Sequence, residues 1–271
     1  LAGMAAATGW QAIIFAPKSA PPAKIAQLLI FGAKVILVDG NYDQAFDLSV
    51  QASAKYGWYC RNTGYNPFTA EGKKTGAFEI WEQVGRHLES SDAPLCVFTS
   101  VGDGNIISGL HKGFKDLYEL GWLTQMPRLF GIQSELSAAI ANAYTANTET
   151  ILPVNATTVA DSISVDLPRD GVRAVRAAVQ THGSYLTVRD EDIIAAIADF
   201  GVNGIFAEPA GSTSLAGLKK AIKEGLIRRD DPVLLLNTGN GLKDVRAAMM
   251  AVPNAAIIEP TMESLKKFLN K

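Results

Sequence analysis

The sequence predicts an α/β protein built on parallel sheets, and two observations carry this prediction. Short runs rich in β-branched and aliphatic residues alternate with longer stretches in which apolar residues recur at helical spacing. Strands that alternate with helices in this way form parallel sheets with crossover helices. Apolar residues make up 48% of the 271 residues and charged residues only 19%, which supports a sizeable core rather than disorder.

The alternation occurs in two series. In the first, the expected strands are residues 11–16, 34–38 and 58–60, and the expected helices are 22–31, 42–56 and 75–88. In the second, the expected strands are 94–99, 128–133 and 232–237, and the expected helices are 106–121, 189–200 and 211–225. The polar, proline-terminated segment 88–94 separates the series, so we predict two domains, residues 1–90 and 91–271.

Charge and composition exclude several classes of protein. Lysine and arginine number 25 against 27 acidic residues, a net charge of −2, which argues against a general nucleic-acid binder or a polybasic membrane anchor. No apolar run reaches 18 residues, so no membrane span is predicted. The two cysteines, Cys60 and Cys96, are too few for a disulfide framework and do not have the spacing of metal ligands. We therefore expect no metal site, and we expect a reducing, cytoplasmic location.

The start of the chain resembles the interior of a helix. Residues 1–8 have helical composition, but no capping residue precedes them, and the charged region and cleavage site of a signal peptide are missing. We therefore expect that the chain has lost its beginning.

A glycine-rich loop follows the strand at 94–99. Gly102 and Gly104 allow backbone amides to converge just before a helix, which together would make a phosphate cradle. An ordinary tight turn is the alternative, because glycines serve that too. The loop is not a dinucleotide fingerprint, which would need a glycine at position 107, and no Gly-Lys-Ser/Thr follows to make a P-loop.

Three further features carry polar groups at places where α/β proteins bind ligands. Thr238 follows the last strand, although it or Asn237 could simply cap the next helix, and the residues alone favour the cap. Glu208 precedes Pro209 and could serve a ligand or satisfy the amides of the following helix, the latter being favoured. Residues 61–75 form a donor-rich loop, suited to an anion or merely solvated.

Four motifs, taken in order, resemble those of the threonine synthase family. They are NPFTAEGKKT at 66–75, VGDGNI at 101–106, FAEPAGSTSLAGL at 206–218 and LNTGNGLKD at 236–244. The resemblance covers essentially the whole chain, and the last motif separates this family from the serine and threonine dehydratases. It implies a pyridoxal-phosphate enzyme of fold type II, the tryptophan-synthase-β-like fold, that converts O-phosphohomoserine and water to threonine and phosphate.

The resemblance also implies site residues. Backbone amides of the glycine loop would hold the cofactor phosphate, a role that falls on Gly102, Asp103, Gly104, Asn105 and Ile106. Thr238 would meet the pyridine nitrogen with a neutral hydroxyl, which sets the electronics of the ring differently from a carboxylate. The smaller, mobile domain (1–90) would close over the substrate phosphate, and the larger one (91–271) would bind the cofactor. The substrate candidates are Asn62, Thr63, Lys73 and Lys74, and a homodimer is expected.

Two departures from the family pattern matter. The Schiff-base lysine of the family lies in a Ser-Phe-Lys-Asp-like motif that does not occur in residues 1–271, so we expect this lysine upstream of Leu1 and expect the chain alone to be inactive. Thr69 stands where several relatives carry an arginine, whose fork suits a dianionic phosphate better than a hydroxyl does. Lys73 and Lys74 could compensate for that loss.

Several alternatives therefore stay open. Within the fold, the chain could belong to a cysteate synthase-like β-replacement enzyme, acting for example on O-phosphoserine, or to a serine/threonine dehydratase-like enzyme. Release of phosphate would distinguish a phosphorylated substrate from the others. A non-catalytic relative that lacks the lysine is a further possibility, and a nucleotide-binding module is weakened by the failed glycine fingerprint.

Overall fold

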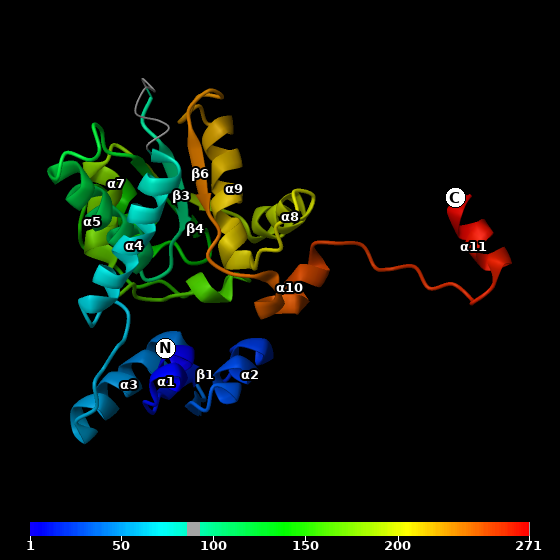
Figure 1. The fold of residues 1–271 in the computed structure, drawn as a ribbon, viewed down its shortest axis with the longest axis horizontal. Coiled ribbons are helices and arrows are strands. Elements are labelled where there is room, and N and C mark those ends of the chain that lie inside the picture. The colour runs from blue at the N-terminus through cyan, green and yellow to red at the C-terminus, as the bar shows by residue number, and fades with distance from the viewer. Residues whose placement is uncertain (86–92, 271) are drawn as a thin grey trace.

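The computed structural model describes residues 1–85 and 93–270 and contains two parallel sheets (Figure 1). The smaller sheet pairs β1 (Ile13–Pro17) with β2 (Lys34–Val38). The larger has the order β5-β4-β3-β6, and its strands are β3 (Cys96–Ser100), β4 (Arg128–Ser134), β5 (Ser184–Val188) and β6 (Val233–Leu236). Parallel strands separated by helices confirm the predicted α/β class.

Helices precede, connect and follow these strands. Near the smaller sheet lie α1 (Ala2–Thr8), α2 (Pro22–Ile30) and α3 (Tyr42–Tyr56). Around the larger sheet lie α4 (Phe68–Gln83), α5 (Asn105–Glu119), α6 (Ala139–Thr145), α7 (Gly171–Gln180), α8 (Asp190–Gly201) and α9 (Pro209–Lys223). Helix α10 (Val245–Met250) follows the last strand and lies beside the body. An extended segment then leads away from the body to α11 (Met262–Leu269) (Figure 1).

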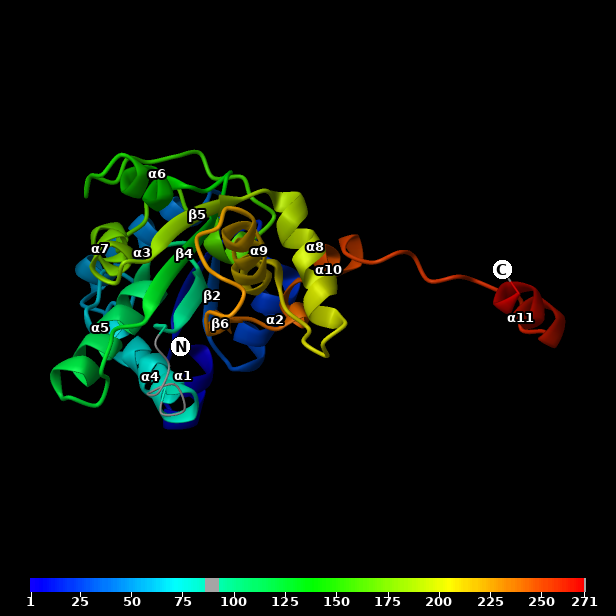
Figure 2. The same ribbon diagram turned by 90° about the horizontal axis from the view of Figure 1, so that it is seen from above.

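The larger sheet is covered on both faces, as Figure 2 shows. Val97 and Leu129 point to the face that packs against α4, α5 and α7. Phe98 and Phe130, whose rings stack at 4.5 Å, point to the opposite face, against α8 and α9. Successive residues of a strand face opposite sides, so both apolar layers come from the same short strands.

Helices α4 and α5 approach each other closely because α5 carries two glycines at the contact. A Cβ atom added to Gly109 would lie 2.6 Å from Cβ of Lys73, and one added to Gly113 would lie 2.7 Å from Cβ of Ala77. Both distances are shorter than van der Waals contact, so no larger residue fits there without displacing α4. The packing fixes Lys73 beside the beginning of α5.

Several predicted elements are confirmed and others are wrong. The strand at 34–38 and the helix at 42–56 are found with the predicted ends. Residues 58–60 form no strand, and the expected loop at 61–75 is helical from Phe68 onward. The helix starts there because Pro67, with its fixed φ, already has helical angles (φ −63°, ψ −28°). Strand β5 and helices α6, α10 and α11 were not predicted.

The predicted domain boundary falls mostly on residues 86–92, outside the described part of the chain. Helix α4 precedes this boundary in sequence but packs against α5 of the larger unit. The division into residues 1–90 and 91–271 therefore stays a prediction.

The small unit of β1, β2 and their helices meets the larger unit largely through polar side chains. These contacts are Tyr42 Oη to Asp103 (2.6 Å), Asn41 Nδ2 to Asp166 (2.7 Å), Lys24 Nζ to Asp161 (2.9 Å) and Arg169 to Asp43 (3.2 Å). They lie around the carboxyl end of the larger sheet, so the interface is also the wall of a cleft.

The sequence predicted neither a membrane span nor a metal site. None of their helices is long and apolar enough to cross a membrane. The same residues contain no group of three histidine, cysteine, aspartate or glutamate side chains placed to hold a metal ion.

Gly113→Val is expected to destabilise the protein by about 1–3 kcal/mol, because the new side chain would overlap Ala77 and the backbone of Lys74. The free energy of unfolding in urea measures this. Gly72→Ala is the matched control, since Gly72 lies in α4 with open space around it, and the change should stabilise the protein by about 0.5–1 kcal/mol. Equal effects of the two substitutions would contradict the close α4–α5 packing.

Candidate active site

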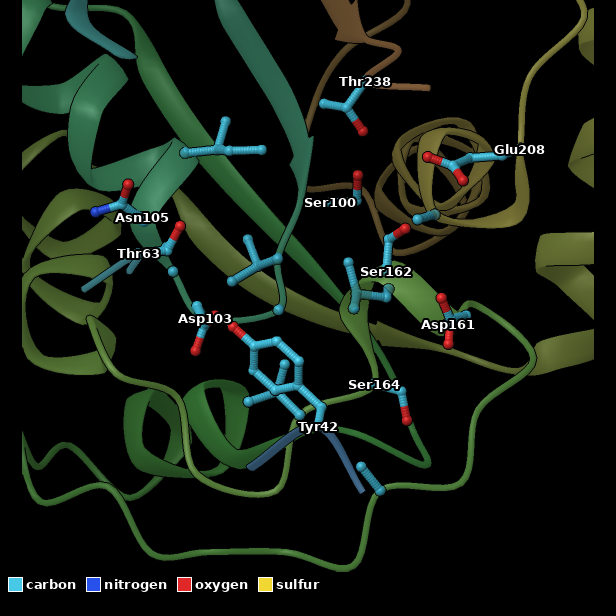
Figure 3. Close-up of a pocket in the computed structure, with 18 of the residues that line it drawn as sticks. Tyr42, Thr63, Ser100, Asp103, Asn105, Asp161, Ser162, Ser164, Glu208 and Thr238 are labelled. Carbon is cyan, nitrogen blue, oxygen red and sulfur yellow. Dashed lines mark hydrogen bonds between the residues drawn. The ribbon is translucent and has the colours of Figure 1, made fainter. Parts of the chain in front are cut away.

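A cavity of about 580 Å³ lies where the strands of the larger sheet end, between this sheet and the small unit (Figure 3). The carboxyl ends of parallel strands share one edge, which is where open α/β sheets bind ligands. The lining side chains labelled in the figure are Tyr42, Thr63, Ser100, Asp103, Asn105, Asp161, Ser162, Ser164, Glu208 and Thr238.

The loop between β3 and α5 presents backbone amides to this cavity. Val101 N donates to Ile132 O, but within the described chain the amides of residues 102–106 donate to no protein acceptor. Helix α5 begins at Asn105, and no side chain caps its N-terminus. Free amides and the positive end of a helix dipole, turned toward one cavity, form a site for an anion such as phosphate.

The loop needs glycine at two positions. Gly104 has φ +90°, in the left-handed region, and an added Cβ would lie 2.6 Å from Cβ of Ala174. An added Cβ at Gly102 would lie 2.9 Å from Cα of Ile163. The tight turn therefore depends on the absence of side chains, and the sequence analysis correctly placed these glycines in the loop.

Asp103 turns its carboxylate away from the amides and toward the small unit. It accepts a hydrogen bond from Tyr42 Oη at 2.6 Å and another from the backbone amide of Arg169 at 3.1 Å (Figure 3). Burial raises the pKa of Asp103, and the hydrogen bond from Tyr42 opposes this rise. Burial beside this carboxylate likewise raises the pKa of Tyr42, which stays protonated and donates.

Within the described residues, the side-chain oxygen of Asn105 accepts no hydrogen bond. Its Nδ2 donates to Asp170 at 2.8 Å, and its Oδ1 is buried with no hydrogen-bond partner. An unsatisfied buried acceptor is costly, so this atom is suited to a donor that arrives with a ligand.

Thr238 lines the cavity on the β6 side, and the favoured prediction that it or Asn237 caps a helix is wrong. The caps are provided by Asn240, which accepts from Leu242 N at 2.9 Å, and by Asp244, which accepts from Ala247 N at 3.0 Å. Within the described chain, the hydroxyl of Thr238 has no hydrogen-bond partner. It is therefore available to a ligand.

Glu208 was also expected to satisfy helix amides, and the structure shows a different arrangement. It occupies the N-cap position of α9, yet its side chain makes no capping bond. The carboxylate is only 5% exposed and lies between two cations, 3.5 Å from Lys24 Nζ and 3.6 Å from Lys243 Nζ. Ion pairing to lysines from distant parts of the chain thus takes precedence over local capping.

Only part of the donor-rich segment 61–75 lines the cavity. Thr63 and Lys73 line the cavity. Asn62 instead donates to Ser49 Oγ at 2.6 Å. Lys74 is instead paired with carboxylates of α4 and α5, 2.9 Å from Glu71 and 2.6 Å from Asp116. The cavity therefore brings together two of the four predicted substrate residues.

The ionisation of Lys73 is unusual. Burial, and next the neighbouring positive charge of Arg61, lower the pKa of Lys73 to about 8. Lys73 therefore loses its charge at a lower pH than an ordinary lysine does.

Some cavity residues were not predicted at all. Tyr42 comes from the start of α3, whereas Asp161, Ser162 and Ser164 come from a short segment after the loop that follows α6. The only signal in the sequence was a run of small polar residues over 157–164, which also suits an ordinary loop.

Comparison with protein families and curated relatives agrees with this geometry. A family model described as "Pyridoxal-phosphate dependent enzyme" matches residues 1–239. A threonine synthase of Methanocaldococcus jannaschii is 36% identical over all of this chain and 66% of its own length. One of Methanosarcina acetivorans is 32% identical over 90% of this chain and 59% of its own length. The chain thus spans about 60–66% of the length of these relatives.

Solved structures share the fold at lower sequence identity. A processed threonine deaminase from Solanum lycopersicum has a TM-score of 0.68 and 22% identity, covering 88% of this chain and 63% of its own. The diaminopropionate ammonia lyase of Escherichia coli has a TM-score of 0.73 and 19% identity, covering 93% and 68%. These structures establish the predicted fold type II architecture.

Tyr42→Phe is expected to lower the free energy of unfolding by about 1–3 kcal/mol at neutral pH, because it removes a hydrogen bond from a buried carboxylate. Tyr42 lowers the pKa of Asp103, so its bond favours the ionised form. The loss should therefore shrink as pH falls and Asp103 is protonated in both proteins. Urea unfolding at several pH values tests this. Tyr56→Phe, at an exposed tyrosine, is the control. A loss that stays constant with pH would contradict this role.

Proposed function

We propose, since the chain belongs to the family of pyridoxal-phosphate-dependent enzymes, that it is part of a threonine synthase. The reaction would convert O-phosphohomoserine and water to threonine and phosphate. Threonine synthases that are 32–36% identical over 90–100% of this chain support the proposal. Because those relatives are longer than this chain, the substrate and the whole activity belong to the proposal.

The observation that carries the proposal is the row of unpaired amides at residues 102–106 beside the uncapped start of α5. A phosphate group fits this arrangement because it accepts several hydrogen bonds and carries the charge that the helix end favours. We assign the cofactor phosphate to the backbone of Gly102, Asp103, Gly104, Asn105 and Ile106. The side chain of Asp103 takes no part, since it is bound to Tyr42 and Arg169.

The other polar groups of the cavity fit the rest of the cofactor. Pyridoxal phosphate supplies an electron sink for carbanion chemistry at amino-acid carbons. Thr238 would meet the ring nitrogen with its unpaired hydroxyl, and Asn105 would accept a hydrogen bond at Oδ1. Glu208 keeps Lys24 and Lys243 paired and in place, 3.5 and 3.6 Å away.

The substrate side is assigned to the small unit and α4. Thr63 and Lys73 face the cavity and would bind the substrate. Asn62 and Lys74 stay predictions, because their side chains are engaged with Ser49 and with Glu71 and Asp116. A homodimer and a cytoplasmic location also belong to the proposal.

Thr69 leaves a second candidate reaction open. Its side chain is buried and donates to Asn66 O at 2.7 Å, so it is not free to bind a substrate phosphate as an arginine would. This applies equally to O-phosphohomoserine and O-phosphoserine, so a β-replacement enzyme that acts on O-phosphoserine remains the runner-up.

An assay of three substrates separates these functions. O-phosphohomoserine should yield threonine and phosphate, O-phosphoserine should release little phosphate, and threonine should yield no 2-oxo acid. The assay is run on the protein loaded with pyridoxal phosphate. Phosphate release from O-phosphoserine alone would favour the β-replacement reaction, and release from neither substrate would contradict the proposal.

Gly104→Ala is expected to weaken the binding of pyridoxal phosphate at least about tenfold, because a Cβ at φ +90° is strained and overlaps Ala174. A spectroscopic titration measures the affinity. Gly121→Ala is the control, since Gly121 has φ +74° but nothing within 4 Å of its added Cβ. Unchanged cofactor affinity in Gly104→Ala would remove the loop from the cofactor site.

Thr238→Val is expected to shift the absorption maximum of bound pyridoxal phosphate and to reduce turnover, since valine keeps the shape of threonine but cannot hydrogen-bond the ring nitrogen. Absorption spectra of the loaded protein test this. The control is Thr150→Val, at an exposed threonine outside the cavity. A spectrum identical to that of the unaltered protein would place Thr238 away from the ring.

A further inference from the structure

A second hollow, of about 370 Å³, lies next to the main cavity. Arg61, Thr69 and Lys73 are among the residues that line it. Lys73 also lines the main cavity, so this one side chain is shared by both spaces. A ligand held in the main cavity could therefore extend past Lys73 toward Arg61.

The two cations of this hollow have no counter-ion. Within the described chain, neither Arg61 nor Lys73 forms an ion pair or a side-chain hydrogen bond. The two cations are close enough to repel each other, because the charge of Arg61 adds to burial in lowering the pKa of Lys73. Asp103 and Asp170 act on Lys73 from the larger unit but form no ion pair with it, so the two neighbouring cations still favour the binding of an anion.

The other groups that could bind an anion here are already engaged. Lys74 is paired with Glu71 of α4 and Asp116 of α5. The hydroxyl of Thr69 donates to Asn66 O. Among Thr69, Lys73 and Lys74, only Lys73 therefore has no hydrogen bond or ion pair from its side chain within the described residues.

The fold holds Lys73 in place. Its Cβ lies against Gly109 of α5, where any larger residue would displace α4. Because α5 begins directly after the loop 102–106, the same helix positions both the amides and the lysine. The cation thus has a fixed relation to the cofactor site.

We propose that Arg61 and Lys73 form the subsite for the dianionic phosphate of the substrate. This inference rests on the proposed function, since it names the residues that select a phosphorylated substrate. The guanidinium presents paired donors to two phosphate oxygens, and the ammonium of Lys73 adds a second charge on the cofactor side. An amino acid with an uncharged side chain would leave both cations unpaired and is therefore rejected.

Binding of inorganic phosphate tests the subsite without turnover. The protein is first saturated with pyridoxal phosphate, so that the loop 102–106 is filled, and phosphate is then titrated by calorimetry. Arg61→Gln should weaken phosphate binding about ten- to a hundredfold, the range expected for a lost charge-assisted hydrogen bond. Arg61→Lys, which keeps the charge but not the fork, should give an intermediate affinity.

Arg246→Gln is the matched control. Arg246 is also exposed and has no ion pair within the described chain, but it lies on α10, outside both hollows. It changes the net charge equally and should leave phosphate affinity unchanged. If the protein does not retain pyridoxal phosphate, the titration reports two sites, and Arg61→Gln should remove only one of them.

The pH dependence tests Lys73. It is faced by Arg61 from the preceding loop, by Asp103 and Asp170 from the larger unit, and by Tyr59 in the same hollow. Sulfate is the probe, because it remains a dianion between about pH 6 and 9. Its affinity should fall as pH rises through about 8, where Lys73 loses its charge, and Lys73→Met should abolish this fall.

The outcomes distinguish this inference from the proposed function. If phosphate binding responds equally to Arg61→Gln and Arg246→Gln, the subsite is wrong even when the enzyme releases phosphate from O-phosphohomoserine. If Arg61→Gln alone weakens phosphate binding but no threonine is formed from that substrate, the subsite stands and the proposed reaction fails.

Discussion

The candidate site depends on one constraint, the turn at Gly104 between β3 and α5. The left-handed backbone at this glycine leaves the preceding amides without protein acceptors and aims them at the cavity. It also sends the carboxylate of Asp103 toward Tyr42, so one short turn both forms the anion site and contacts the small unit. The direction that α5 takes from this turn then determines where α4 and Lys73 lie.

The remaining polar groups of the cleft fall into two kinds. Glu208 and the lysines beside it satisfy one another and keep the wall of the cavity in order. Within the described residues, Thr238 and Asn105 Oδ1, together with the loop amides, have no hydrogen-bond partners and are the groups a ligand would satisfy. This division between satisfied and unsatisfied groups, rather than the number of polar residues, identifies the part of the cleft suited to the cofactor.

Sequence patterns correctly predicted the elements whose ends depend on residues close together in the sequence. The helix at 42–56 was found with its correct ends because Asn41 and Gln44 form a capping box and Gly57 ends it. Patterns failed where distant contacts decide: the two lysines that hold Glu208 lie on α2 and beyond β6. Lys73 and Lys74 are adjacent in sequence but about 100° apart around α4, so only the position of α5 shows which one faces the cavity.

The polar contacts between the small unit and the larger sheet have a consequence for motion. Tyr42, Asn41 and Lys24 cross the gap to carboxylates, and water can replace each of these partners when the units separate. Polar contacts of this kind cost less free energy to separate than apolar ones, so they favour a cleft that can open and close. Dissolved ions screen exposed charges over about 8 Å at physiological ionic strength, which makes the balance between the open and closed cleft sensitive to salt.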